Sequence, residues 1–400
     1  MTRSPSKTIA HVIDSLGTVG GAEQQLVQLL SRFRDPRLSH ALVCLYETPA
    51  DASRRHLVPS TVAVHHLFGP GIRRSTRWSN VRRLNSLLRG LDPALIHCSL
   101  PNASLAARVV GRLRHIPVVE TLVNISHEEV RTEDNPQVTP LKLAFHRWID
   151  RMTMPFVARF QAISPTAARS WMEVVGINRD LIRIIPRGID LERFQGLSRS
   201  AARHDLGAEL ALAHDAFVLL NLGREQPQKG QRFLLEAMTE ITARIPQAVL
   251  LLAGSPGLHS RELRQTAEGL GLGNRIVFLG RRADIPRLLA ASDVFVFPSL
   301  YEGLGVSLLE AMAAGLPVVT TDRPPMSEIV QTGINGLLIP AGDPAALATA
   351  VVHLAEDPPT RSRLGEAAKR TVTSQFNIEG VVRQVEGLYL EVLGLETPPT

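Results

Sequence analysis

Two glutamates in a glycine-containing segment are the residues best suited to chemistry. The segment at residues 297–319 reads FPSLYEGLGVSLLEAMAAGLPVV, and seven residues separate Glu302 from Glu310. An ionised carboxylate accepts hydrogen bonds from two neighbouring hydroxyls, which is what a ribose or a sugar ring offers. On one continuous helix these two glutamates would lie on different faces. We therefore expect Glu302 in a loop and Glu310 on the helix that follows, with both carboxylates directed into one cleft.

The same segment carries the signals of a helix start and a helix end. Gly303 and Gly305 favour a loop, and the helix is expected to begin near Val306. Gly315, followed by proline two residues later, is typical of a helix C-terminus. The backbone N–H groups of Leu304, Gly305 and Val306 would then meet phosphate oxygens at the helix start. The alternative is a capping loop with one exposed glutamate.

Two cations form a second candidate site in NLGREQPQKGQ, residues 221–231. Arg224 and Lys229 stand between a predicted strand and the next predicted helix. Arginine offers a planar fork to phosphate oxygens, and lysine offers a compact charge. Two cations at the carboxyl end of a strand suit a pyrophosphate leaving group. The alternative is a solvated surface pair, which is how most arginines and lysines occur.

A glycine-containing loop near the N-terminus, SLGTVGGAEQQ, is the third candidate site. Gly17, Gly20 and Gly21 allow the backbone to approach a ligand closely, and the helix expected near Ala22 presents N–H groups that favour anions. The loop lacks the full G-x-G-x-x-G pattern, which disfavours a nicotinamide cofactor. The alternative is a tight turn between a strand and a helix.

The elements that position these loops alternate between short apolar runs and amphipathic segments. The runs predicted as buried strands are residues 8–13, 41–46, 95–98 and 117–122 in the first half, and 216–222, 248–253, 275–279, 294–297 and 317–320 in the second. Segments predicted as helices include 23–33, 231–242 and 307–314. Such alternation is typical of parallel sheets with right-handed crossovers.

Two such series predict an α/β protein with two Rossmann-like, doubly wound parallel-sheet domains. The pattern breaks near residues 190–204, where turn-forming and charged residues gather. The final amphipathic segment, residues 380–393, need not belong to the second domain. Doubly wound sheets bind ligands at the carboxyl ends of their strands, so two of them facing each other would enclose a cleft lined by the three candidate loops.

Composition indicates the broad class of the protein and the kinds of partner that it suits. Of the 400 residues, 44% are apolar and 20% are charged, as in ordinary globular proteins. The formal charge of +6 suits an anionic partner, and phosphorylated substrates and acidic lipid fit equally well. Aromatic residues make up only 4% and no nucleic-acid motif stands out, so nucleic acid is not an expected partner.

Cysteine usage and the N-terminal segment favour a cytoplasmic protein. Cys44 and Cys98 lie in apolar runs, which suits core thiols in a reducing compartment. The N-terminal MTRSPSKTIAHVIDS lacks the apolar core of a secretory signal, and no apolar stretch reaches the length that spans a bilayer. The expected location is the cytoplasm, with the inner face of the membrane as a place of peripheral contact.

An arginine-rich segment leaves two interpretations open. Residues 73–89 contain six arginines and no acid, and an apolar helix stripe is supplied by Trp78, Val81, Leu84, Leu87 and Leu88. One interpretation is contact with anionic lipid or a phosphorylated acceptor. The other, which we prefer, is a solvated crossover helix.

Taken together, these motifs resemble glycosyltransferase family 4, the retaining group with the GT-B fold. The family's Glu-x7-Glu motif matches Glu302 and Glu310, its Arg and Lys pair matches Arg224 and Lys229, and its glycine loop matches residues 20–23. The stretches AISPTAAR, IIPRGIDLERF, IVFLGRRADIP and INGLLIP are also similar. The resemblance covers nearly the whole chain and is weakest over residues 45–90.

The resemblance implies a division of labour between the two domains. Residues 1–195 would form the acceptor-side domain, with a helix at 380–395 crossing back onto it, and residues 200–378 would bind a nucleotide sugar. Arg224 and Lys229 would hold the donor diphosphate, Glu310 the ribose hydroxyls and Glu302 the transferred sugar. The donor-binding residues implied for the base, the phosphates and the helix start are Gly21, Gly254, Leu279, Arg281, Gly303, Leu304, Gly305 and Val306.

One departure from the family pattern concerns the acceptor side. Many members have a histidine at the end of the strand read here as VVETLVN, where this chain has Val123 and Asn124. His127 follows in NISHEE and is one candidate for the same space, and a solvated loop histidine is the other interpretation. Glu23, Asn124 and His127 are therefore the expected acceptor-side residues.

The function implied is the metal-independent transfer of a hexosyl-type group from a UDP- or GDP-sugar, with retention of configuration. The acceptor would be a lipid-linked or polysaccharide intermediate. No Asp-x-Asp motif is present to hold a divalent ion on a diphosphate, so we expect neither a metal nor another cofactor. The rival functions are a nucleotide-sugar epimerase of the same fold and a catalytically silent nucleotide-sugar-binding protein.

Overall fold

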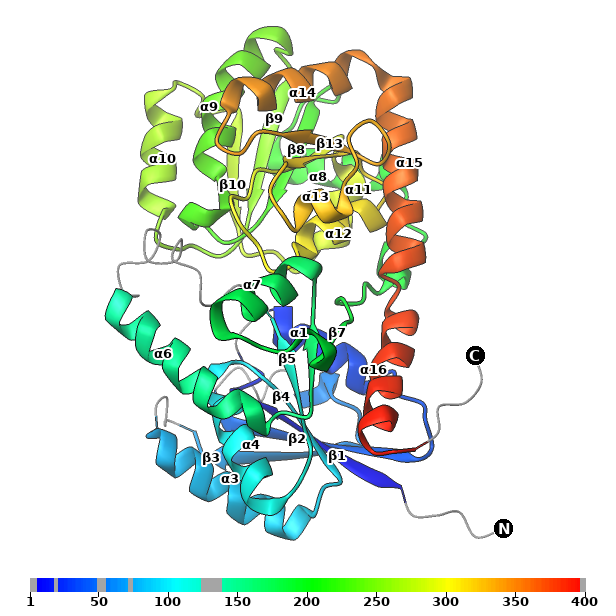
Figure 1. The fold of residues 1–400 in the computed structure, drawn as a ribbon. Helices are drawn as coiled ribbons and strands as arrows, with labels where there is room; N and C mark the ends of the chain where they lie inside the picture. The colour runs from blue at the N-terminus through cyan, green and yellow to red at the C-terminus, as the bar shows by residue number, and fades with distance from the viewer. Residues whose placement is uncertain (1–5, 18–20, 49–54, 71–74, 124–138, 396–400) are drawn as a thin grey trace. The chain divides into compact units, whose positions relative to one another are not determined.

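The chain forms two compact units, each built on its own parallel sheet (Figure 1). The computed structural model describes residues 6–17, 21–48, 55–70, 75–123 and 139–395. Unit 1 comprises Met1–Gly188 and Ile378–Thr400, and unit 2 comprises Ile189–Asn377. Residues 189–195, assigned to the first domain from the sequence, group with unit 2. The chain passes between the units twice, and Ile189 pairs with Asn377 beside the two crossings.

Unit 1 contains a seven-stranded parallel sheet in the order β3-β2-β1-β4-β5-β6-β7. Its strands are β1 (Lys7–Ile13), β2 (Leu38–Tyr46), β3 (Ala63–Phe68), β4 (Leu95–Ser99), β5 (Val118–Leu122), β6 (Arg159–Ala162) and β7 (Ile182–Ile184). The chain starts at the centre with β1, moves outward to β3, and returns to the other side of β1 with β4. The topological switch point of this sheet therefore lies between β1 and β4.

Helices and short 3-10 turns connect these strands. They are α1 (Gly21–Leu30), η1 (Arg55–Leu57), α3 (Arg77–Leu91), α4 (Pro101–Arg114), α6 (Pro140–Thr153), η2 (Met154–Phe156), α7 (Pro165–Val175), η3 (Arg179–Leu181) and, from the end of the chain, α16 (Ile378–Val392). Hydroxyl side chains start three of them: Thr76, Thr139 and Ser164 each accept a hydrogen bond from a backbone N–H in the first turn of α3, α6 and α7.

The last helix of the chain covers one face of the first sheet. Val381, Val385 and Leu388 of α16 belong to the same buried cluster as Ile9 and Val119 of the sheet. The red helix in Figure 1 shows this return of the C-terminus to unit 1. Burial of this apolar stripe, at about 25 cal/mol per Å² of apolar surface, is what attaches α16 to unit 1.

Three histidines lie in the sheet face beneath α16. His11 and His97 are register partners on β1 and β4, and Nε2 of His11 lies 3.0 Å from Nδ1 of His40 on β2. Nδ1 of His97 is hydrogen-bonded to the hydroxyl of Tyr389 on α16. Burial lowers the pKa of His97 and of His40 to about 4. Burial, and then the charges of the other two histidines, lower the pKa of His11 well below its usual value. The three rings are therefore neutral at physiological pH.

Unit 2 contains a six-stranded parallel sheet in the order β10-β9-β8-β11-β12-β13. Its strands are β8 (Phe217–Leu222), β9 (Ala248–Ala253), β10 (Ile276–Gly280), β11 (Val294–Phe297), β12 (Val318–Thr321) and β13 (Leu337–Ile339). Strands β8 and β9 are buried along their whole length, as expected for a parallel sheet with helices on both faces.

Helices on both faces bury the sheet of unit 2. They are η4 (Leu191–Phe194), α8 (Arg199–Leu210), η5 (Pro227–Lys229), α9 (Gln231–Arg244), α10 (Ser260–Gly269), α11 (Ile285–Ala291), α12 (Val306–Ala313), α13 (Met326–Ile329), α14 (Pro344–Glu356) and α15 (Pro358–Gln375). Leu234, Met238 and Leu347 are completely buried in one cluster with Leu250 of β9. Across the described segments of both units, no helix combines the length and the apolar character needed to cross a membrane.

Acid should loosen unit 1 through its buried histidines. The pKa of His97 is about 4 when folded and about 6.5 when unfolded, so the unfolded chain binds the proton first. The free energy of unfolding is then unaffected above the unfolded pKa. It falls as the pH decreases toward the folded pKa, by on the order of 3 kcal/mol for this group.

Urea denaturation between about pH 7 and about pH 4.5 measures this effect. His97→Gln should flatten the pH dependence. His353→Gln, an exposed position on α14, is the matched control and should keep the wild-type slope. An unchanged slope in the His97 variant would contradict the assignment.

Candidate active site

The switch point of unit 2 brings two loops to one edge of the sheet. Strands β8 and β11 are hydrogen-bonded neighbours, yet the connections that follow them run in opposite directions. Ligands of doubly wound proteins bind in the crevice that forms outside such strand ends. The loop after β8 carries Arg224 and Lys229, and the loop after β11 carries Glu302, so the structure places these three residues at the same edge.

Lys229 and Glu302 form an ion pair across this edge. The ammonium of Lys229 hydrogen-bonds Oε1 of Glu302, and the hydroxyl of Ser299 donates to the same oxygen at 2.9 Å. The ammonium also lies 5.5 Å from the centre of the Phe297 ring. Both charged side chains are mostly buried, with 14% of Lys229 and 11% of Glu302 exposed. Such burial holds the charges in fixed positions, because neither side chain retains much rotamer freedom.

A close backbone approach holds the two loops together. Gly230 has φ +64°, and a Cβ there would lie 2.0 Å from the carbonyl oxygen of Pro298. The N–H of Leu300 donates to the carbonyl oxygen of Gln228 at 2.8 Å. Glycine is therefore required at residue 230 both for its backbone conformation and for space.

Buried polar side chains fix the strand ends beneath the loops. Asn221 on β8 donates to the carbonyl oxygen of Val296 at 2.8 Å, and Gln231 donates to the Asn221 amide oxygen at 3.1 Å. On the other side, the Thr321 hydroxyl donates to the carbonyl oxygen of Ser299 at 2.7 Å. Because unsatisfied buried polar groups are costly, these bonds resist displacement of either loop.

Arg224 differs from Lys229 in that it is exposed. In the parts of the chain that the structure describes, its guanidinium forms no ion pair or hydrogen bond, so it remains available to an anion. Gly254, after β9, lies directly beneath this loop, since a Cβ there would be 1.8 Å from the carbonyl oxygen of Gly223. The N–H of Gly254 donates to the carbonyl oxygen of Gly280 at 2.8 Å, next to Leu279. Arg281, which follows Gly280, is exposed at the same edge.

Helix α12 begins as the sequence pattern predicts, at Val306. Gly305 is the N-cap residue with φ +83°, and no side chain caps the helix. Leu304 and Gly305 are buried, while Gly303 and Val306 are partly exposed. The first N–H groups of a helix have no intrahelical acceptor and carry the positive end of its dipole. This helix start can therefore bind an anion beside Lys229.

Glu310 on α12 is held by a cation that the sequence reasoning missed. Nη1 of Arg193, on η4, donates to Oε1 of Glu310 at 3.2 Å. Burial raises the pKa of Glu310, and the charge and hydrogen bond of Arg193 oppose that effect. The two glutamates of the motif thus have different partners, Lys229 and Arg193.

Two residues that contact the site had no assigned role in the sequence. Ser299 could have been found from its place in the loop directly after β11. Arg193 could not be placed by spacing, because it lies 117 positions before Glu310 in the sequence. Its only signal was its position within the family-like stretch IIPRGIDLERF.

In unit 1, the third candidate loop leads into α1 at Gly21. A Cβ at Gly21 would lie 1.9 Å from Nη1 of Arg187, so that guanidinium covers the start of the helix. Glu23 is buried, and it contributes after burial itself to raising the pKa of Asp14 at the end of β1. Gly20, Asn124 and His127 lie outside the described residues.

The side chains of unit 2 are suited to bind a ligand that carries an anionic group close to its own hydroxyl groups. Lys229, Arg224 and the start of α12 supply positive charge, and Glu302 and Glu310 supply acceptors for hydroxyls. Within the described part of the chain, no three His, Cys, Asp or Glu side chains are grouped to hold a metal ion.

Comparison with known proteins identifies the family. Residues 203–371 match the family model described as "Glycosyl transferases group 1", and residues 19–193 match the model described as "Glycosyltransferase Family 4". The chain belongs to the family 4 glycosyltransferases. This glycosyltransferase is 26% identical over 314 residues to UDP-Gal:alpha-D-GlcNAc-diphosphoundecaprenol alpha-1,3-galactosyltransferase of Escherichia coli, and the match covers 78% of each chain.

The relatives with higher identity are matched over shorter parts. This glycosyltransferase is 31% identical over 286 residues to D-inositol 3-phosphate glycosyltransferase of Geodermatophilus obscurus, covering 68% of this chain and 60% of the relative. Several further curated relatives are matched over about half of their length.

Solved structures support the fold. The structure of Anabaena HepE in complex with UDP and glucose superimposes with a TM-score of 0.81 at 22% identity, covering 96% of this chain and 100% of that one. The fold class predicted from the sequence, an α/β protein with two parallel-sheet domains of the GT-B type, is confirmed.

A substitution at Gly230 tests how the site is held together. Gly230→Ala should lower the free energy of unfolding by about 2 kcal/mol or more, because alanine adds strain at positive φ and meets the Pro298 carbonyl. Gly273→Ala is the matched control in unit 2, since a Cβ there meets no atom within 4 Å. It should change stability by less than about 0.5 kcal/mol. Equal stabilities in denaturant unfolding would contradict this account of the loops.

Proposed function

We propose that this glycosyltransferase moves a hexosyl-type group from a UDP- or GDP-sugar to an acceptor, with retention of configuration and without a metal ion. The observation that carries the proposal is the arrangement at the switch point of unit 2. There, the buried Lys229 and the uncapped start of α12 lie beside Glu302, at the edge where such folds bind ligands.

The comparisons lend support to a nucleotide-sugar donor. The relative from Escherichia coli is named for a UDP-galactose donor, and HepE was solved with UDP and glucose. The donor of that relative and the ligands of HepE are consistent with a site in this chain that offers cations to a diphosphate and carboxylates to hydroxyls.

Each residue has a role in this proposal. Arg224 and Lys229 hold the diphosphate, together with the N–H groups of Leu304, Gly305 and Val306. Glu310 accepts hydrogen bonds from the ribose hydroxyls, and Glu302 from the transferred sugar. The base lies near Gly254, Leu279 and Arg281. Glu23, Asn124 and His127 are assigned to the acceptor side.

The reaction proceeds by early cleavage of the bond between the sugar C1 and the phosphate oxygen. The oxocarbenium-like centre that results is attacked on the same face by an acceptor hydroxyl, which forms the new C1–O bond. The acceptor proton passes to a departing phosphate oxygen. Lys229, Arg224 and the α12 N–H groups stabilise the charge that develops on the diphosphate, which is where fixed positive groups lower a barrier most.

Glu302 serves in this mechanism as a hydroxyl ligand. Its carboxylate is engaged by both Lys229 and Ser299, so it is acceptor-only and anchored rather than a free acid near the scissile oxygen. Glycosidase-type catalysis would instead need a protonated carboxyl placed to protonate the leaving oxygen.

The acceptor is proposed to be a lipid-linked or polysaccharide intermediate. The name of the Escherichia coli relative, which acts on a diphosphoundecaprenol-linked sugar, supports this choice. A lipid-linked acceptor would place the enzyme in the cytoplasm with peripheral contact to the inner face of the membrane.

Donor binding tests the assigned site directly. At about a hundredfold excess over its Kd, the right nucleotide sugar should raise the Tm by about 5 °C in a screen of UDP- and GDP-sugars. Glu310→Gln should weaken that shift, because an amide accepts fewer hydrogen bonds from the ribose than a carboxylate. If no nucleotide sugar raises the Tm, the donor proposal fails.

Turnover tests the role of Lys229. Lys229→Ala should lower kcat/KM about a hundredfold, because one fixed charge on the leaving diphosphate is lost. Lys369→Ala, an exposed lysine on α15 of the same unit, is the matched control and should retain full activity. Product analysis by mass spectrometry with acceptor extracts separates transfer from donor epimerisation and from binding without turnover. Equal activity of the two variants would contradict the assignment.

Chelation tests metal independence. Activity should be unchanged in excess EDTA, because Arg224 and Lys229 neutralise the diphosphate instead of a divalent ion. Loss of activity that added magnesium restores would show that a metal is required.

A further inference from the structure

Helix α6 of unit 1 presents large apolar side chains to its surroundings. Leu141, Phe145, Trp148 and Met152 are 81%, 49%, 58% and 58% exposed. Their spacing of four, three and four residues places them within about 60° of one another around a helix that turns about 100° per residue. These four side chains, named the α6 stripe, therefore form one continuous apolar strip along the helix.

The α6 stripe lies on the side of the helix that faces away from unit 1. Leu143, the buried residue of α6, is about 200° from Leu141 on the helical wheel. Asp150 also points inward, where it pairs with Arg108 at 2.5 Å. Arg108 is in turn bound to the buried Glu120 of β5. This buried network fixes the orientation of α6, so the stripe is held outward.

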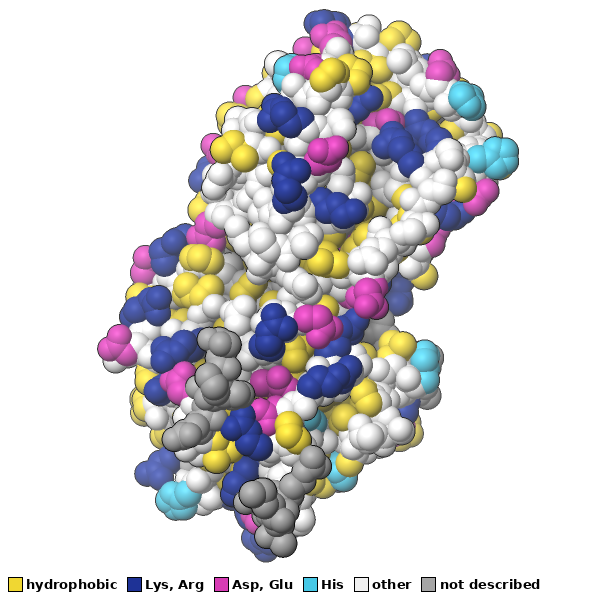
Figure 2. Space-filling model, turned by 90° about the vertical axis from the view of Figure 1, so that its right-hand side faces the viewer, with side chains coloured by type: hydrophobic (Ala, Val, Ile, Leu, Met, Phe, Trp, Pro, Cys, Tyr) yellow, Lys and Arg dark blue, Asp and Glu magenta, His cyan; other side chains and the backbone are white. Residues whose placement is uncertain are grey.

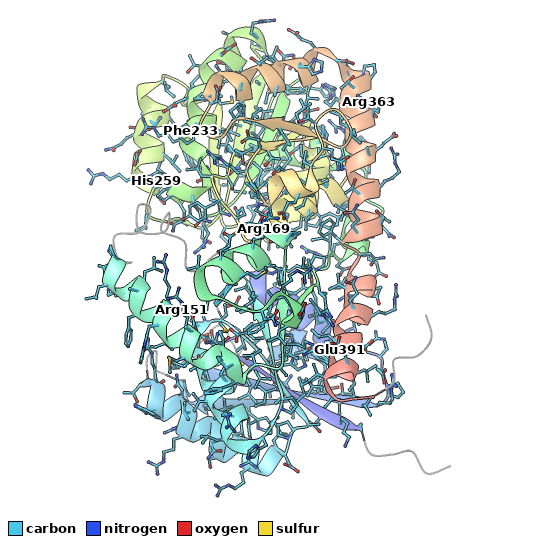
Figure 3. The ribbon with its side chains drawn as sticks, in the orientation of Figure 1. Arg151, Arg169, Phe233, His259, Arg363 and Glu391 are labelled. Atoms are coloured by element: carbon cyan, nitrogen blue, oxygen red, sulfur yellow. The ribbon has the colours of Figure 1, made fainter. Side chains whose placement is uncertain are left out.

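Positive charge surrounds the α6 stripe. Helix α6 carries Lys142, Arg147 and Arg151, and its single acid is the inward-facing Asp150. Figure 3 labels Arg151 on this helix. On α3, the guanidinium of Arg77 lies over the Phe145 ring at 5.2 Å from its centre. By contrast, basic and acidic side chains are interspersed on the face shown in Figure 2, as on an ordinary solvated surface.

Trp78 extends the apolar surface onto α3. The sequence placed Trp78 in the apolar stripe of this helix, and the structure shows that its side chain is 80% exposed. Leu84 and Leu88, which belong to the same stripe, are buried. Trp78 immediately follows Arg77, whose guanidinium lies over the Phe145 ring, so an exposed tryptophan adjoins the residue that links α3 to the α6 stripe.

We propose that the α6 stripe, with Trp78, docks this enzyme onto a bilayer that contains anionic phospholipids. An amphipathic helix with aromatic residues on one face and basic residues beside them lies in the plane of a membrane interface. Tryptophan is enriched at that depth because its ring is apolar and its N–H is polar. Each nearby Lys or Arg adds about 1 kcal/mol of attraction to an anionic surface. Charge complementarity therefore selects the bilayer as the occupant.

This inference deepens the proposed function, since it rests on an acceptor that resides in a membrane. It assigns the contact mainly to α6, whereas the sequence had singled out the arginine-rich segment that includes α3. Vesicle binding needs neither donor nor acceptor. A negative result would therefore leave the donor proposal in place.

Flotation with lipid vesicles tests the docking surface. The full-length protein should float with vesicles of phosphatidylglycerol and phosphatidylethanolamine, and at least about tenfold less with phosphatidylcholine alone. The double variant Phe145→Ser/Trp148→Ser should bind the anionic vesicles at least about tenfold more weakly, because two large apolar side chains no longer insert. High salt should weaken binding of the wild type.

Matched controls keep the test specific. Leu258→Ser/Ile334→Ser removes two apolar side chains of unit 2 that are 59% and 58% exposed, and it should bind vesicles like the wild type. Leu141→Ser/Met152→Ser repeats the loss of binding without altering an aromatic residue. Because all these side chains are exposed, the Tm of each variant should match that of the wild type.

Two outcomes would overturn the proposal. The first is equal vesicle binding by the wild type and the Phe145/Trp148 double variant, or no binding by either. The second is a wild-type dimer in analytical ultracentrifugation that the same double variant converts to a monomer, without vesicle binding. That result would assign the stripe to a second copy of the chain.

Discussion

The ion pair between Lys229 and Glu302 exists because parallel strands deliver their loops to one edge of a sheet. Strands β8 and β11 are hydrogen-bonded neighbours, although 71 residues lie between Leu222 at the end of β8 and Val294 at the start of β11. Two further strands, β9 and β10, lie in that interval of the sequence. The backbone contact between Gly230 and Pro298 sets the spacing of the two loops. Everything assigned to the donor site, from the cations to the uncapped start of α12, depends on this spacing being fixed before a ligand arrives.

The sequence was informative wherever the signal was local. Alternating strand and helix patterns predicted both sheets, and the glycines around Glu302 predicted the start of α12 at Val306. The strands at Ala63–Phe68, Arg159–Ala162, Ile182–Ile184 and Leu337–Ile339 were missed, because they are short or interrupted by polar residues such as the two histidines of β3. Local patterns identify an element from its own residues, whereas these segments are strands because they pair with neighbouring strands in the sheet.

Contacts between distant segments could not be predicted from the sequence. The pairing of Arg193 with Glu310 and the burial of three histidines beneath α16 depend on how elements pack, which periodicity does not encode. Helical spacing placed Trp78 in one apolar stripe with Leu84 and Leu88, but it did not reveal that Trp78 is exposed while the two leucines are buried. The α6 stripe was likewise hidden, because an amphipathic pattern does not reveal which of its faces the domain covers.

Because α16 is the last helix and yet covers the first sheet, the order of synthesis differs from the order in which the two units can be completed. Unit 2 is continuous from Ile189 to Asn377, so all of its strands are synthesised before α16. Unit 1 lacks the cover over Ile9 and Val119 until α16 has left the ribosome. That apolar sheet face therefore stays uncovered by α16 while the whole of unit 2 is made, and loss of α16 would damage the half of the protein made first.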